Sequence, residues 1–279
     1  PRFRTAARRT VWAGAPAPGP DGLPYRAWLR TPGSFDILAD VCSDIAYNDN
    51  IPYDLNFSLM AMLPKGDEPC GNAECVRAPD CLRPLSMKNA DVKLMASAAN
   101  RQLRQLAAKT SPEQQGFVIG RQFLNNVVIV DAEARRHSLS PTAAVDKPVF
   151  ISMDIAAAFP SLGHQWMWEV LHRWGVQGPI MKLLRAFYHW PVSYLELGGE
   201  RRPLLVAASG VAQGCPLSGT IWALVFDPFI IAIGREIRLI ARGLLSACAD
   251  DLGIVLARLH DIEKLAPHIL AAESLAGLR

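Results

Sequence analysis

Two adjacent carboxylates, Asp250 and Asp251, stand between two short apolar runs near the end of the chain. The two runs predict strands, which would place both acids at the tip of a β-hairpin. Asp is a poor strand former and neighbouring negative charges repel each other, so the pair favours a cation, above all a divalent metal ion, between them. An isolated Asp-Asp pair is more commonly a solvated turn, and this interpretation stands until a partner is found.

A third carboxylate, Asp154, follows a strand predicted over residues 147–153. Two strands that deliver carboxylates to one edge of a sheet can build a shared magnesium site, because Mg²⁺ prefers carboxylate oxygens, water and substrate phosphates. Two such ions can hold the attacking and leaving oxygens of a phosphoryl transfer. The three acids together therefore predict metal-dependent phosphoryl-transfer chemistry.

The elements that must position these acids follow from the spacing of apolar residues. Residues 91–109 have apolar positions at three- and four-residue steps, which predicts an amphipathic helix. Further helices are predicted at 166–174, 180–188, from Pro216 to about 237, and at 261–275, with strands at 193–197 and 203–206. Residues 28–48 and 51–63 are predicted as helical or mixed apolar segments, and 64–82 as a polar loop. The sum is an α+β fold, with helices packed on a small antiparallel sheet that carries the acids.

Composition narrows the class of protein without identifying it. The chain has 279 residues, half of them hydrophobic, which suits one large domain or two modest ones. The net charge of +3 is weak support for a nucleic-acid partner, because global charge says little about a local groove. The longest apolar stretch, residues 221–233, is interrupted by Asp227 and Pro228, so neither a membrane span nor a signal peptide is predicted.

The six cysteines indicate reduced thiols in an intracellular protein. Cys70, Cys75 and Cys81 could suggest zinc, but no fourth ligand is near in the sequence, and a loop is the better prediction. The chain begins at Pro1 and stops at Arg279, and we expect it to be a fragment of a longer protein.

One further motif lies between the acids. Gln213 and Gly214 precede Cys215-Pro216, which by itself is most simply a bend with Pro in the first turn of a helix. In combination with the acids, however, the chain resembles the reverse transcriptase domain of non-LTR (LINE-type) retrotransposons. The resemblance is carried, in the family's order, by Pro18–Gly22, Arg83–Ser86 with Lys93, Gln115–Arg121 with Asn126, Met153–Phe159, Gly210–Ser218 and Ala249-Asp250-Asp251.

This resemblance implies a right-hand polymerase fold with fingers and palm but no thumb. Residues 1–146 would form the N-terminal extension and fingers, and residues 147–279 the palm with interleaved fingers elements. The implied activity is that of an RNA-directed DNA polymerase, which transfers dNTPs onto a primer 3′-hydroxyl with two Mg²⁺ ions, or Mn²⁺. The implied partners are an RNA template and a DNA primer. Thumb and endonuclease domains would belong to the same full-length polyprotein, and the site of action would be the nucleus.

The resemblance also implies roles for individual residues. Asp154 and Asp250 would hold both ions, with the main-chain carbonyl of Ile155 facing one ion and Asp251 assisting. Phe159 stands where the family places its steric gate against a 2′-hydroxyl, and its alternative is a core aromatic. Further candidates are Gln213 and Gly214 at the nucleotide and templating base, Arg83 and Lys93 at the triphosphate, and Arg121, Asn126 and Lys65 on nucleic acid. For each lysine, including Lys88, a solvated surface charge is the competing interpretation.

Three positions depart from the family pattern. Cys248 replaces the usual aromatic before Ala-Asp-Asp, Ala212 replaces a common basic residue, and Pro160 replaces an acid. The lysine that the family carries shortly after a motif like Ser274–Arg279 is also missing from this sequence. Two alternatives therefore stay open: a non-catalytic remnant that only binds nucleic acid, and a palm polymerase that makes RNA. Phe159 speaks against the second, because RNA synthesis must admit the 2′-hydroxyl.

Overall fold

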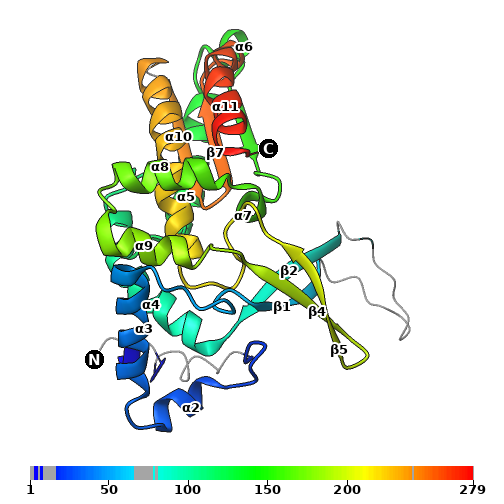
Figure 1. Cartoon of the computed structure of the whole chain (residues 1–279). Helices are drawn as coiled ribbons and strands as arrows, with labels where there is room; N and C mark the ends of the chain where they lie inside the picture. Colours follow the sequence, from blue (N-terminus) through cyan, green and yellow to red (C-terminus); the bar gives the residue numbers. More distant parts are fainter. Residues whose placement is uncertain are drawn as a thin grey trace. The chain divides into compact units, whose positions relative to one another are not determined.

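A computed structural model describes residues 3–5, 7–8, 17–65, 78, 81–240 and 242–278. The chain divides into two units that interleave along the sequence (Figure 1). The first unit comprises Pro1–Ala99, Gln177–Ala208 and Ala212–Pro216, and the second comprises Asn100–Val176, Ser209–Val211 and Leu217–Arg279. The boundary expected after residue 146 separates the fingers from the palm of a polymerase, and it stays a prediction.

The first unit holds a four-stranded sheet in the order β2-β1-β4-β5. Its strands are β1 (Ser58–Pro64), β2 (Leu82–Lys88), β4 (Val192–Leu197) and β5 (Glu200–Val206). Strand β1 runs antiparallel to β2 and parallel to β4, so this sheet is mixed. The predicted strands around Gly198 and Gly199 are confirmed as β4 and β5, which pair antiparallel.

The helices of the first unit are α2 (Tyr25–Arg30), α3 (Ser34–Asn48) and α9 (Gly178–Ala186), together with the start of α4 (Ala90–Ala107). The prediction of a helical or mixed apolar segment at 51–63 was wrong, because residues from Ser58 onward form β1. A short apolar run cannot tell a strand from a buried helix by periodicity alone. Here the pairing of β1 with β2, from Ser58↔Lys88 to Pro64↔Leu82, decides in favour of the strand.

The second unit is built around a three-stranded antiparallel sheet in the order β3-β7-β6. Its strands are β3 (Val149–Met153), β6 (Gly243–Cys248) and β7 (Asp251–Leu256). Its helices are α5 (Leu124–Ser138), α6 (Ala143–Asp146), α7 (Ala158–Ser161), α8 (His164–Arg173), α10 (Ser218–Ile240), η2 (Leu259–Asp261) and α11 (Ile262–Ala276). The predicted small antiparallel sheet and the predicted long helix after Pro216 are thereby confirmed.

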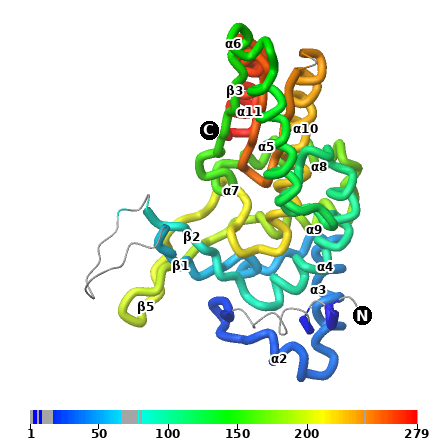
Figure 2. The backbone as a smooth tube through the Cα atoms, turned by 180° about the vertical axis from the view of Figure 1, so that it is seen from behind, coloured from blue at the N-terminus to red at the C-terminus, as the bar shows by residue number. Residues whose placement is uncertain are grey.

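Helices α5 and α10 pack on this sheet, as the view from behind in Figure 2 lets the reader follow. A side chain at Gly253 would meet Val130 of α5, whereas Leu245 reaches Gly234 of α10. Since Gly253 and Ile254 point to opposite faces and Leu245 pairs with Ile254, the two helices cover opposite faces of the sheet. The hairpin is therefore held from both sides.

Helix α10 is the core of the second unit, and Ile221 to Val225 are fully buried. Pro228 inside the helix has no N–H, so it cannot donate to the carbonyl of Leu224 four residues earlier. The indole of Trp174 donates to that carbonyl at 3.1 Å, and the indole of Trp166 donates to the next one, of Val225, also at 3.1 Å. The two tryptophans of the α8 region thus satisfy the backbone around the proline.

Among the described residues, no helix has both the length and the apolar character that crossing a membrane requires. Of the three cysteines considered for a zinc site, Cys70 and Cys75 lie outside the described residues. Cys81 is an exposed free thiol.

Candidate active site

The three predicted acids gather at one edge of the β3-β7-β6 sheet. Asp154 directly follows β3, and Asp251 is the first residue of β7. The pairs Met153↔Leu252 and Cys248↔Asp251 bring the end of β3 beside the hairpin tip, where Ala249 and Asp250 form the turn. The expected hairpin with both acids at its tip is therefore present.

The electrostatics of this edge show that the carboxylates affect one another. Asp250 is partly buried, and burial raises its pKa above the usual range; the charges of Asp251 and Asp154 raise the pKa further, against a hydrogen bond from its own backbone. Asp154 and Asp251 are exposed. In the described part of the chain, none of the three carboxylates forms an ion pair with a basic side chain.

This donor set fits a hard divalent ion by its chemistry. Carboxylate oxygens with open access to water are the ligands that Mg²⁺ prefers, and a bound cation would offset the burial and the like charges that raise the pKa of Asp250. Across residues 17–65, 81–240 and 242–278, no three His, Cys, Asp or Glu side chains are already gathered tightly enough to hold an ion. The acids thus lie at one edge without forming a closed metal cluster.

Phe159 lies in the second unit with the acids, within a run of aromatic rings. Its ring centroid is 5.8 Å from that of Phe117 and 5.7 Å from that of Trp222. The ring is partly exposed, while the backbone carbonyl accepts a hydrogen bond from the amide of Val211 at 2.8 Å. Both earlier interpretations, steric gate and core aromatic, are compatible with this position, and the gate stays a prediction.

The loop of residues 111–121 contacts the hairpin directly, and it contains a residue that sequence reasoning missed. Gln114 is fully buried, and its side-chain amide bonds to the backbone of Ala249 through both ends. The sequence-based alignment of the motif selected the next residue, Gln115, whose side chain only caps the carbonyl of Pro112. The sequence did contain a signal for Gln114. Two adjacent glutamines precede Gly116, and moving the start of the motif by one residue selects Gln114.

Arg121 and Asn126 have partners inside the chain. The guanidinium of Arg121 donates to the carbonyls of Ala108, Thr110, Ser111 and Gln114, and so ties the 111–121 loop together. The amide of Asn126 donates to the carbonyl of Ala247 in β6 at 2.8 Å. Both residues hold the surroundings of the hairpin, and their expected contacts with nucleic acid stay predictions.

The predicted nucleotide contacts Gln213, Gly214, Arg83 and Lys93 belong to the first unit. The carbonyl of Gln213 accepts a hydrogen bond from the amide of Ser86 in β2 at 3.0 Å. Gly214 has a φ of +97°, and a Cβ there would lie 3.1 Å from both the side chain of Leu85 and the carbonyl of Ser86. Close backbone approach thus explains this glycine.

The basic residues of the first unit differ in exposure. Arg83 is exposed on β2, and the backbone amide of Lys65 donates to the carbonyl of Cys81. Lys93 is buried, its ammonium donates to the carbonyl of Ala17 at 3.3 Å, and burial lowers its pKa. Lys88 is also buried, so a solvated surface charge is the wrong interpretation for Lys93 and Lys88. Contacts of Arg83, Lys93 and Lys65 with phosphates stay predictions.

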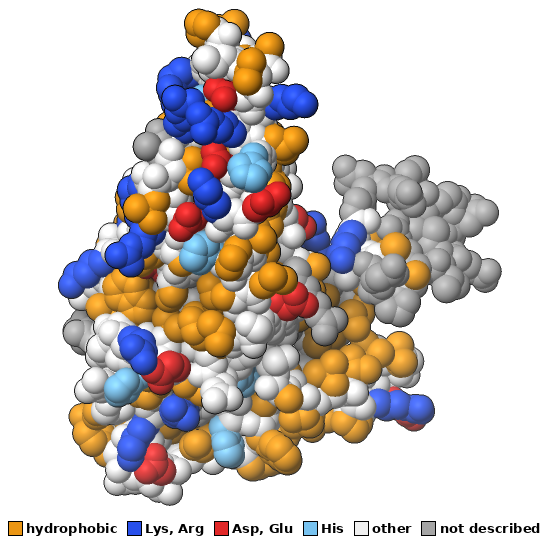
Figure 3. Space-filling view, turned by 90° about the horizontal axis from the view of Figure 1, so that it is seen from above, with side chains coloured by type: hydrophobic (Ala, Val, Ile, Leu, Met, Phe, Trp, Pro, Cys, Tyr) orange, Lys and Arg blue, Asp and Glu red, His pale blue; other side chains and the backbone are white. Residues whose placement is uncertain are grey.

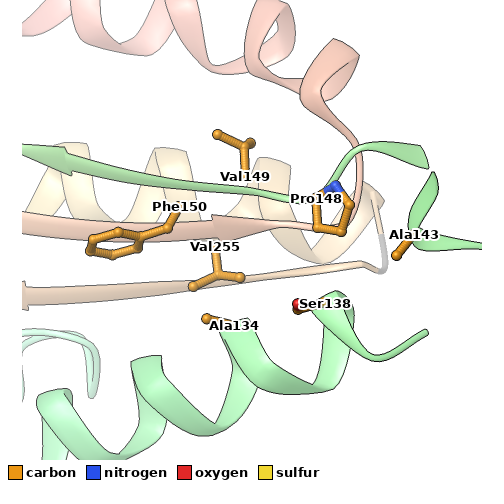
Figure 4. A pocket seen from close by; sticks show the side chains of 7 residues that line it. All are labelled: Ala134, Ser138, Ala143, Pro148, Val149, Phe150 and Val255. Atoms are coloured by element: carbon orange, nitrogen blue, oxygen red, sulfur yellow. The ribbon is translucent and has the colours of Figure 1, made fainter. Parts of the chain in front are cut away.

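A separate pocket of about 180 Å³ lies in the second unit, away from the acids. Figure 4 shows its lining, which comes from α5, α6, β3 and β7: Ala134, Ser138, Ala143, Pro148, Val149, Phe150 and Val255. Val149 is at the opposite end of β3 from Asp154, and the lining carries no charged side chain. On the face in Figure 3, Lys and Arg side chains lie among acidic and hydrophobic ones, in keeping with the small net charge.

Comparison with known proteins identifies the family of this chain. The family model described as reverse transcriptase (RNA-dependent DNA polymerase) matches residues 64–279. The chain is 27% identical over 224 residues to the transposon TX1 uncharacterized 149 kDa protein of Xenopus laevis, covering 77% of this chain and 16% of that protein. It is 24% identical over 266 residues to the retrovirus-related Pol polyprotein from a type-2 retrotransposable element of Drosophila melanogaster, covering 94% of this chain and 24% of that protein.

Among solved structures, the fold is similar to apo telomerase from Candida tropicalis truncated from its C-terminal domain. The TM-score is 0.56 at 10% identity, and the match covers 88% of this chain and 54% of that one. The chain thus spans a small part of its curated relatives and about half of this structural neighbour. Because the family model matches most of its length, this chain belongs to the reverse transcriptase family, and its relatives are proteins of non-LTR retrotransposons.

Proposed function

We propose that this chain carries the polymerase site of an RNA-directed DNA polymerase, which joins dNTPs to the 3′-hydroxyl of a primer on an RNA template. The observation that carries the proposal is the convergence of Asp154, Asp250 and Asp251 at one sheet edge, where burial and the charges of Asp251 and Asp154 raise the pKa of Asp250. Membership of the reverse transcriptase family supplies the reaction class.

Each residue has a definite part in this proposal. Asp154 and Asp250 would hold two divalent ions, Mg²⁺ or Mn²⁺, with the carbonyl of Ile155 as a further ligand and Asp251 beside them. When bound, these ions supply positive charge that favours ionisation of the primer hydroxyl and neutralises the triphosphate. Phe159 would exclude the 2′-hydroxyl of a ribonucleotide by its bulk.

The remaining candidates would bind rather than react. Gln213 and Gly214 would contact the incoming nucleotide and the templating base, and Arg83 and Lys93 would contact the triphosphate. Arg121, Asn126 and Lys65 would contact nucleic acid, since phosphate contacts come from such side chains. The relatives are several times longer than this chain, so we propose that thumb and endonuclease regions belong to the same polyprotein, which acts in the nucleus.

A second function is favoured by one residue. Cys248 stands beside Asp250 where the family pattern has an aromatic ring, and it is partly buried, paired with Asp251 in the hairpin. Without the ring, the primer end loses an apolar surface against which to pack. A reverse-transcriptase-like remnant that binds template and primer without extending the primer is the corresponding alternative.

Primer extension on an RNA template distinguishes these functions. The wild-type chain should extend a DNA primer with dNTPs in Mg²⁺, slowly and with few additions per binding event, and Asp154→Asn should reduce extension to background. Asp131→Asn changes an exposed acid on α5 in the same way and should leave extension unchanged. Tight primer–template binding without extension in the wild type would support the remnant, and full extension by Asp154→Asn would refute the metal assignment.

A further inference from the structure

The turn of the catalytic hairpin is held by a side chain from a distant part of the sequence. The amide nitrogen of Gln114 donates to the carbonyl of Ala249 at 3.1 Å, and its amide oxygen accepts from the backbone N–H of Ala249 at 2.8 Å. The same oxygen accepts from the amide of Gly116, also at 2.8 Å. The polar groups of this fully buried glutamine are thus bonded to both backbone groups of Ala249 and to its own loop.

The residue that Gln114 holds has an unusual backbone. Ala249 has a φ of +60°, the left-handed region that residues other than glycine rarely adopt and that needs support from its surroundings. Ala249 immediately precedes Asp250, so its backbone conformation sets the direction in which the Asp250 carboxylate leaves the turn. Gly116 completes the fit, because a Cβ there would lie 2.2 Å from the nitrogen of Ala249.

The 111–121 loop is itself fixed, so it can act as a rigid support. The Arg121 guanidinium joins four of the carbonyls between residues 108 and 114, and the buried carboxylate of Asp227 accepts the amide of Ser111 at 2.7 Å. The loop also pairs with β6, where Ala247 bonds to the backbone of Glu113 at 2.9 Å and of Gln115 at 2.8 Å. Gln114 therefore reaches the turn from a loop anchored on both sides of it.

We propose that Gln114 is a positioning residue for the polymerase site: its amide holds Ala249 in the left-handed conformation and thereby directs Asp250 toward the divalent ions. The reaction that Asp250 serves rests on the proposed function. The positioning itself concerns the affinity of this sheet edge for a cation, and it can be tested without catalysis.

The test compares three variants of the 279-residue chain by Tb³⁺ luminescence, with Tb³⁺ as the probe for a hard oxygen-ligated ion. Gln114→Met keeps the length of the side chain and removes its hydrogen bonds, whereas Gln115→Met makes the same change one residue away, where only the Pro112 carbonyl loses a donor. Asp250→Asn identifies the part of the signal that belongs to this site. Displacement of Tb³⁺ by Mg²⁺ then measures the affinity for the natural class of ion.

The expected result for Gln114→Met is a loss of about tenfold or more in affinity, which is the range for residues that orient a metal ligand. Gln115→Met should bind as the wild type does. Equal affinity of Gln114→Met and the wild type, or a wild-type signal that Asp250→Asn leaves unchanged, would overturn the proposal. Circular dichroism establishes that each variant is folded.

Hydrogen exchange of the wild type covers the case in which Gln114→Met does not fold. The backbone N–H of Ala249 should exchange as slowly as the amides of β7, because it donates a hydrogen bond to the side chain of Gln114. Fast exchange would overturn the proposal. Where the wild type extends primers, Gln114→Met should lower kcat and raise the Mg²⁺ concentration needed, with the KM for primer–template unchanged. If the wild type does not extend primers, the proposed function fails, while Tb³⁺ affinity and exchange still decide the role of Gln114.

Discussion

Replacing Asp227 with asparagine should change how the stability of the chain depends on pH. The Asp227 side chain is 1% exposed within α10, and its carboxylate accepts the amide of Ser111. Burial raises the pKa of Asp227 from 3.8 to about 6; the nearby charge of Glu113 adds to the rise, and the Ser111 hydrogen bond and Arg121 act against it. The folded chain therefore holds a proton at this position over a pH range in which the unfolded chain has lost it.

The direction and the size of the pH effect on the free energy of unfolding follow from the difference in pKa between the folded and the unfolded chain. Because the folded state binds an extra proton between pH 3.8 and about 6, the contribution of Asp227 to stability is fully present only below pH 3.8 and is lost as the pH rises through about 6. At about 1.4 kcal/mol per pKa unit, the rise from 3.8 to about 6 corresponds to about 3 kcal/mol. Asp227→Asn cannot ionise, yet its amide oxygen can still accept from Ser111, so the variant should not show this decline.

Urea unfolding at several pH values between 4 and 7.5, followed by circular dichroism, measures the effect. The free energy of unfolding of Asp227→Asn minus that of the wild type should increase by up to about 3 kcal/mol between pH 4 and 7. Asp131→Asn, on the exposed side of α5, is the matched control and should follow the wild-type pH dependence. Parallel curves for Asp227→Asn and the wild type would refute the raised pKa of the buried Asp227 side chain.

The remaining predictions concern the first unit and the sugar gate. Asn56→Ala should destabilise the chain by about 1–3 kcal/mol in urea unfolding, because the buried ammonium of Lys88 loses one of its two acceptors and the carbonyls of Ala186 and His189 each lose a donor, whereas the exposed Asn50→Ala should have little effect. Gly214→Ala should destabilise by about 2–3 kcal/mol, and by more than Gly199→Ala, because both have a positive φ but only Gly214 is crowded; equal losses would argue against crowding. Phe159→Ala should raise ribonucleotide incorporation in primer extension, and unchanged sugar discrimination would leave Phe159 as a core aromatic.

Much of the second unit was predictable because its signals are local. The apolar runs on either side of Asp250-Asp251 predicted the hairpin, and the long apolar segment after Pro216 predicted α10. In both segments, the apolar run and the residues beside it were enough to predict the conformation without knowledge of a distant partner. The residues of α5 include exposed Val127, Val128 and Ile129, so their pattern does not mark a buried face, and the helix was not predicted.

The strands of the first unit were harder to predict from the sequence, because their conformation depends on pairing with distant strands. Strand β1 is paired along its whole length with β2, and both belong to a sheet that also recruits β4 from more than a hundred residues later. A seven-residue apolar run such as Ser58–Pro64 has no property that excludes a helix until that pairing is known. The acids of the second unit, in contrast, could be located from their strands alone, although the sequence could not give the rise in the pKa of Asp250.

The position of Arg121 shows that residue type alone gives only part of a side chain's role. Sequence reasoning assigned this arginine to a phosphate, since a guanidinium donates well to anions. In the structure, its two terminal nitrogens donate to four backbone carbonyls and so help to hold the 111–121 loop around Gln114. A phosphate contact would have to compete with those carbonyls or use the remaining Nε donor. It follows that loss of activity on replacing Arg121 would not by itself indicate a template contact, because the same change releases the loop that holds Ala249 and, through it, Asp250.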